Sequence, residues 1–237
     1  MNTEKKIPRR MFLWPSLAVL VLLTCSSFLI SRPSDEVYAA AFEGMPYFLN
    51  AIPEGMEKSF GFSSREEFEK ASLGEPYLMQ TVDPEKLLNT AYRERDCIIS
   101  LPEWRFPVIC EGNIKTLLTV ANINGTWQAV AIGGAGLARE LDALEKKYGF
   151  DPLNSSKAIL RLFQLKADIL SVSETGERWE DGLFFPLSSA LVITGSSRQE
   201  DAFYFFDELL PILKEQYLAV WPYIEKDPQN NKGKRGN

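Results

Sequence analysis

The stretch CIISLPEWRFPVIC, residues 97–110, decides how the body of this chain folds. Its apolar and polar residues alternate, which is typical of a strand with one buried face. A turn at Glu103 and Trp104 would fold the stretch back on itself and place Cys97 opposite Cys110, with apolar pairs between them on the same face. The pattern therefore predicts a β-hairpin.

A second hairpin follows directly in the sequence. Residues 114–123 and 126–132 flank the dipeptide Asn124-Gly125, which favours a two-residue turn because both residues tolerate positive φ. Together the two hairpins predict a four-stranded antiparallel β-meander over about residues 96–132.

Helices are expected to cover this meander. Leu137, Leu141 and Leu144 share one helical face, and Gly149 follows as a helix end. A capping box that starts at Ser197 opens a second, longer helix. The fold class that we predict is α+β.

Other segments give weaker signals. Residues 76–82 have the composition of a strand, and Asp83-Pro84 after them is a helix start with an acidic cap and a proline in the first turn. Residues 158–173 fit either a strand or a helix, and their β-branched content favours a strand.

The two cysteines of the body predict a disulfide. Cys97 and Cys110 face each other in the expected hairpin, and the third cysteine lies in the apolar run at residues 11–30. Disulfides persist in exported domains. The alternative is a pair of buried thiols that act as small apolar side chains.

The N-terminal region predicts a membrane span. Residues 11–30 form a run of 20 residues without a charge, long enough for a helix of about 30 Å, the thickness of the hydrocarbon core of a bilayer. Residues 1–10 are basic, so the positive-inside rule keeps them in the cytoplasm and directs the rest outward. We expect a single-pass anchor that contacts the bilayer through residues 11–30 and leaves the C-terminal domain outside the cell membrane.

Three alternatives to the uncleaved anchor stay open. Val37 and Ala39 form a V-x-A site, so cleavage near Ala39 would release a secreted protein. Arg9 and Arg10 open a motif that resembles the core of a twin-arginine export signal. Cys25 could carry a lipid, although the residues before it match a lipidation box poorly. All four interpretations place the body outside the cytoplasm.

The same signals divide the chain into segments. Residues 31–38 are expected to be a linker, residues 39–224 an extracytoplasmic α+β domain, and residues 225–237 a polar disordered tail. About 200 residues after the anchor suffice for one substantial core.

Composition excludes several kinds of site. The chain has no histidine, which removes Ser-His-Asp and Cys-His catalysis and histidine-ligated metals. Beyond residue 32 there are 21 Lys and Arg against 31 Asp and Glu, and an acidic body disfavours nucleic acid as a partner. We find no catalytic residue, cofactor loop or metal-ligand pattern, so an enzyme is the less favoured interpretation.

Two functions from different classes remain. The first is a membrane-tethered, non-catalytic module that binds a protein or peptide at a sheet edge marked by Pro107, with Trp104 and Trp179 as a possible contact surface. The second is an exported hydrolase that uses two carboxylates on a cell-wall or sugar substrate. A cleft with two carboxyl groups of raised pKa would favour the hydrolase, and an unpaired strand would favour the binding module.

The anchor has a direct test. We expect the protein to stay in the membrane fraction after an alkaline carbonate wash, and we expect protease added outside the cell to remove the residues beyond position 33. Recovery of soluble protein with a new N-terminus near Ala40 would instead show cleavage.

Overall fold

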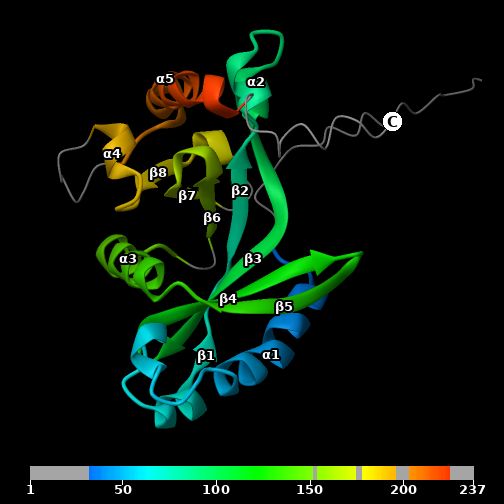
Figure 1. The fold of residues 1–237 in the computed structure, drawn as a ribbon, viewed down its shortest axis with the longest axis vertical. Coiled ribbons are helices and arrows are strands. Elements are labelled where there is room, and N and C mark those ends of the chain that lie inside the picture. Colours follow the sequence, from blue (N-terminus) through cyan, green and yellow to red (C-terminus); the bar gives the residue numbers. More distant parts are fainter. Residues whose placement is uncertain (1–31, 152–153, 175–177, 196–202, 225–237) are drawn as a thin grey trace, which may run out of the picture.

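A computed structural model describes residues 32–151, 154–174, 178–195 and 203–224. These residues form one eight-stranded mixed sheet with helices on both faces, an α+β arrangement (Figure 1). The strands are β1 (Ser72–Leu73), β2 (Tyr77–Val82), β3 (Ile98–Cys110), β4 (Asn113–Ile123), β5 (Thr126–Gly133), β6 (Ser155–Leu162), β7 (Ala167–Glu174) and β8 (Leu183–Pro186). The α-helices are α1 (Asp35–Asn50), α2 (Pro84–Leu88), α3 (Ala135–Tyr148), α4 (Leu191–Thr194) and α5 (Phe206–Ile224). Short 3₁₀ helices are η1 (Glu57–Phe60), η2 (Arg65–Lys70), η3 (Glu94–Cys97), η4 (Phe163–Leu165) and η5 (Trp179–Asp181).

The order of the strands separates the sheet into two halves. It runs β5-β4-β3-β2-β6-β7-β8, and β1 pairs with the far end of β3. β2 and β6 are parallel, whereas the other neighbouring pairs are antiparallel. Parallel neighbours need a long crossover connection, and here that connection contains β3, β4, β5 and α3.

The predicted four-stranded meander is wrong, because residues 97–110 do not turn back. β3 is one strand of 13 residues. The turn comes after it, at Glu111 and Gly112, whose φ values of 52° and 73° suit a two-residue hairpin. Glu103 and Trp104 offer no residue that favours positive φ, so β3 continues through them and its even-numbered residues keep to one face.

Pro107 does not mark a sheet edge either. It lies in β3 opposite Leu117 of β4, so its strand is interior. Its carbonyl oxygen accepts a bond of 2.8 Å from the backbone N–H of Gly74. The missing N–H of the proline therefore faces the short strand β1, where few ladder bonds are lost.

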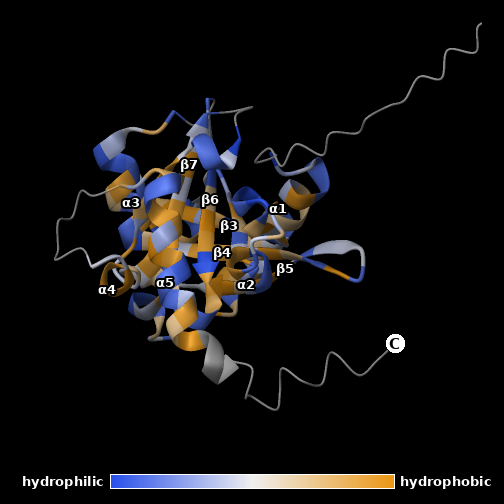
Figure 2. Cartoon of the chain, turned by 90° about the horizontal axis from the view of Figure 1, so that it is seen from above, coloured by the Kyte–Doolittle hydropathy of each residue, from blue (hydrophilic) through white to orange (hydrophobic). Residues whose placement is uncertain are grey.

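The two faces of the sheet have separate apolar cores. α1, α2 and α5 pack on one face and α3 packs on the other, which gives three layers. Figure 2 shows the apolar strands enclosed between the helices. The largest side chains of the first core are Phe62, Trp104, Phe106, Trp179, Phe184, Phe206 and Tyr217. Those of the second are Tyr77, Met79, Leu117, Leu141, Ile159, Leu170 and Phe185.

Several local predictions are confirmed. β4 and β5 form the expected hairpin around Asn124-Gly125, and α3 ends at Gly149 in the left-handed conformation. The Asp83 carboxylate caps α2 by accepting bonds from the N–H groups of its first turn. The ambiguous segment 158–173 contributes to β6 and β7, so its strand interpretation is correct.

The N-terminal predictions fall mostly outside the described residues. No helix of the described part is long and apolar enough to cross a bilayer. The expected span at residues 11–30 belongs to the part that the structure does not describe, as do the basic residues before it, the tail 225–237 and Ser197. The long helix does not begin at Ser197: residues 203–205 are not helical, Tyr204 pairs with Phe184, and α5 starts at Phe206. α1 begins at Asp35, inside the expected linker 31–38.

Candidate functional site

The outer edge of β5 is the feature most suited to binding. β5 is the terminal strand on its side of the sheet. Its sequence, TWQAVAIG, contains no charge and no proline. Natural proteins usually protect such an edge with charges, prolines, β-bulges or a covering element, because its open backbone groups accept another strand.

The backbone groups that face outward can be assigned from the turn. In a two-residue hairpin the residues next to the turn, here Ile123 and Thr126, exchange both hydrogen bonds. Bonding then alternates, so Gln128 bonds to β4 while Trp127 and Ala129 direct their N–H and C=O groups away from the sheet. These two residues supply a short ladder for a further strand.

A bulge lies at the middle of this edge. Val120 pairs with Ala129 and Thr119 pairs with Ala131, so Val130 is the extra residue. Its side chain is 40% exposed. The bulge interrupts the outer ladder at this point, and the exposed valine gives an incoming strand an apolar contact beside residues 126–129.

Helix α1 is seated directly against β5. A Cβ placed on Gly44 would lie 2.1 Å from the Cβ of Ala129, so glycine permits the helix to approach the strand this closely. Arg65 fixes the end of α1, since its guanidinium donates to the carbonyl oxygens of Asn50 at 3.2 Å and Ile52 at 2.9 Å. The strand edge therefore has a rigid helix beside it.

The opposite edge of the sheet is protected. β8 has four residues and ends at Pro186. Phe184 exchanges two backbone hydrogen bonds with Tyr204, at 2.9 and 2.8 Å, so the segment before α5 covers the outer side of β8. The contrast singles out β5 as the edge that is open in the described structure.

Two clefts open among charged residues, and only part of their charge is paired. The first, of about 430 Å³, is lined by Arg95, Arg178 and Glu180 among others. Glu180 accepts a hydrogen bond from Arg178 and lies 3.8 Å from Arg95. The second, of about 640 Å³, lies between Phe150 and Leu183, and the carboxylates of Asp151, Glu174 and Asp181 line it.

Among the described residues, the Asp168 carboxyl group has a raised pKa, and it lines neither of these clefts. Burial raises the pKa of Asp168, while the Arg161 guanidinium, whose Nε lies 3.2 Å from the carboxylate, opposes the shift. The Glu140 carboxylate nearby adds to this rise, but it accepts hydrogen bonds from the backbone N–H and the hydroxyl of Ser188, and neither cleft is lined by Glu140 or Asp168. In the described part no three His, Cys, Asp or Glu residues gather as a metal site.

A buried polar cluster lies under α3. Glu145 of α3 accepts hydrogen bonds from the Lys157 ammonium and the Tyr77 hydroxyl, and the Lys157 nitrogen lies 4.9 Å from the centre of the Tyr77 ring. Burial raises the pKa of Tyr77, and the Glu145 carboxylate adds to the shift. Neither of the two clefts above includes these groups in its lining, and we interpret the cluster as a structural link between α3 and the sheet.

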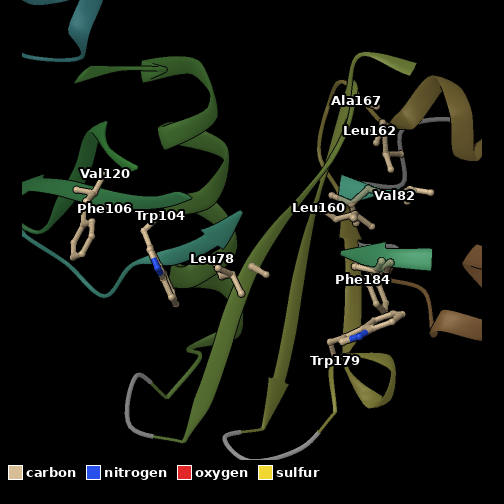
Figure 3. Close-up of a cluster of buried hydrophobic side chains, with 14 of the residues drawn as sticks. Leu78, Val82, Trp104, Phe106, Val120, Leu160, Leu162, Ala167, Trp179 and Phe184 are labelled. Atoms are coloured by element: carbon tan, nitrogen blue, oxygen red, sulfur yellow. The ribbon is translucent and has the colours of Figure 1, made fainter. Parts of the chain in front are cut away.

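The two tryptophans expected at a contact surface are in the core. Trp104 is 6% exposed and Trp179 is 2% exposed. Figure 3 shows Trp104 near Leu78 and Trp179 beside Phe184 within the buried cluster. Trp104 is buried because β3 runs straight through the position where a hairpin tip was expected. Trp179 is buried because its ring packs edge-on against Phe184 and Phe206, so the contact-surface interpretation is wrong for both residues.

The expected disulfide does not fit this geometry. Cys97 precedes β3 and Cys110 ends it, and both thiols are buried and free. At about 3.3 Å per residue the strand separates them by about 40 Å, whereas a disulfide needs Cα atoms within about 7 Å. A bridge between them within one chain is excluded.

The sequence analysis expected a binding edge on the sheet but did not assign it to the residues of β5. The missing charge in residues 126–133 was a readable signal. What the sequence did not reveal is that this hairpin, rather than the strand with Pro107, lies at the end of the sheet.

No family model, curated protein or solved structure matches the chain.

The state of the two thiols can be tested in a Cys25→Ser background. We expect the melting temperature to be the same with and without reductant, because a bridge closing the 97–110 loop would contribute about 3 kcal/mol and several degrees. Burial raises the pKa of Cys97 to about 12, so an alkylating reagent at pH 8 should leave it unmodified in the native protein and modify it in urea. A drop in melting temperature on reduction would contradict the structure.

Proposed function

We propose that this protein is a non-catalytic binding module that takes an extended segment of a partner protein at the outer edge of β5. The observation that carries the proposal is the uncharged, proline-free edge strand with no neighbour in the described structure. In this mode of recognition the backbone ladder supplies affinity, and side-chain contacts supply specificity.

The surroundings of β5 support such a role. A two-residue hairpin fixes its position, and α1 packs closely on it through Gly44 and Ala129. A rigid, preformed edge loses little conformational entropy when a strand is added. The exposed side chain of Val130 adds an apolar contact at its centre.

We further propose that the module works outside the cytoplasm, tethered to the cell membrane. The support is the uncharged run at residues 11–30 and the basic residues before it. The partner would then be a protein that is exposed on the same side of the membrane.

The edge can be probed by a photo-crosslinking amino acid at position 128 in intact membranes. Gln128 is exposed on β5, and Leu218, 60% exposed on α5, serves as the control position for the label. We expect a product from position 128 that position 218 does not give. A product of twice the chain's own mass would identify a second copy and contradict a separate partner.

A lysine at the edge should abolish this product. Val130→Lys places a charge where an incoming strand would lie, and we expect the crosslink to fall at least about tenfold. Val192→Lys on α4 is the matched control, because Val192 is 91% exposed and far from β5 in the chain. Both substitutions should change the free energy of unfolding by less than about 0.5 kcal/mol, so an unchanged crosslink in a folded Val130→Lys protein would overturn the proposal.

A further inference from the structure

We propose that the segment bound at β5 is basic, with lysine or arginine side chains placed against one flank of α1. The inference rests on the proposed function and names the chemical class of the partner. It is carried by the charges and exposed side chains beside the β5 edge.

The two flanks of α1 face different parts of the sheet. The Tyr38 ring lies 5.6 Å from the Phe106 ring of β3, so that flank faces the centre of the sheet. Gly44 contacts Ala129 of β5. Residues three or four apart share a side of a helix, so Tyr47 lies on the Gly44 side of α1. Glu43, four residues before Tyr47, lies on the next stripe around the helix, farther from the centre of the sheet than Gly44 and turned toward solvent.

The flank beside β5 is acidic and carries an exposed aromatic ring. Glu36 and Glu43 belong to it, are exposed, and form no ion pair among the described residues. Tyr47 is 71% exposed. Neither α1 nor β5 contains a lysine or an arginine, so these carboxylates have no cation on their own elements.

A basic strand would complement this flank. Its cations would face Glu36 and Glu43, and one could lie over the ring of Tyr47, an arrangement that is favourable for lysine and arginine. Charge complementarity at the rim of an interface acts mainly on selectivity and on the rate of association. The ladder on β5 would bind the backbone, and α1 would select the side chains.

A second copy of the chain is a poorer occupant. Two β5 strands paired about a two-fold axis would bring the same flank of each α1 together. Glu36 and Glu43 of both copies would then meet without cations between them, which disfavours the pairing. A partner segment rich in acidic residues is disfavoured for the same reason.

Three short peptides test the preference. Each contains the alternating core Thr-Val-Thr-Val, flanked by lysines, by glutamines or by glutamates, and binding to the full chain in detergent is measured by fluorescence anisotropy. We expect the lysine peptide to bind at least about tenfold more tightly than the glutamate peptide at low salt. The difference should shrink in about 0.5 M salt, because exposed charges are screened.

Two variants assign the preference to α1. Glu43→Gln should weaken binding of the lysine peptide about threefold and leave the glutamine peptide unchanged. Glu215→Gln, an exposed position on α5, should change neither. Equal loss for both peptides in Glu43→Gln would point to a structural effect and contradict the charge argument.

The outcomes separate this inference from the proposed function. Equal binding of all three peptides, abolished by Val130→Lys, would overturn the basic preference and retain the strand-binding edge. Failure of the glutamine and lysine peptides to bind would overturn both.

Discussion

The unbroken length of β3 is the constraint on which the rest of the structure depends. Its first half pairs with β2 and its second half with β4 and β1, so one strand joins the two halves of the sheet. Trp104 lies at the join, buried in the core shared by α1 and α5. A turn at this position would separate the halves and expose the tryptophan, which explains why the alternation of apolar residues must continue straight through it.

The open edge follows from that constraint. Because β2 and β6 occupy one side of β3, the hairpin of β4 and β5 can extend the sheet only on the other side, and nothing in the described structure follows β5. The segment before α5 covers the edge at β8 through Tyr204. Helix α1 leaves the β5 edge uncovered and brings Glu43 and Tyr47 beside it. The same packing that stabilises the strand therefore gives the edge an acidic neighbour and an exposed aromatic ring.

Local signals in the sequence predicted local structure well. Asn124-Gly125, the Asp83 cap and Gly149 all mark the ends of elements where the structure has them, because each acts through its own backbone conformation or a neighbouring N–H group.

Partners across the sheet were not predictable in this way. A 13-residue strand and a hairpin have nearly the same alternation, and the parallel pairing of β2 with β6 joins segments about 80 residues apart, for which a single sequence holds no signal. The expected disulfide and the exposed Trp104 failed together because both depended on that one turn, whereas Trp179 is buried by its own contacts with Phe184 and Phe206.

The account's central claim, that the outer side of β5 is unpaired in the isolated protein, can be measured by amide hydrogen exchange. The N–H groups of Trp127 and Ala129 should exchange rapidly, while that of Gln128, bonded to β4, should be protected with the rest of the sheet. Adding a bound strand should slow the first two and leave the third unchanged. Equal protection of all three amides in the isolated chain would show that the edge is already occupied and would contradict the account.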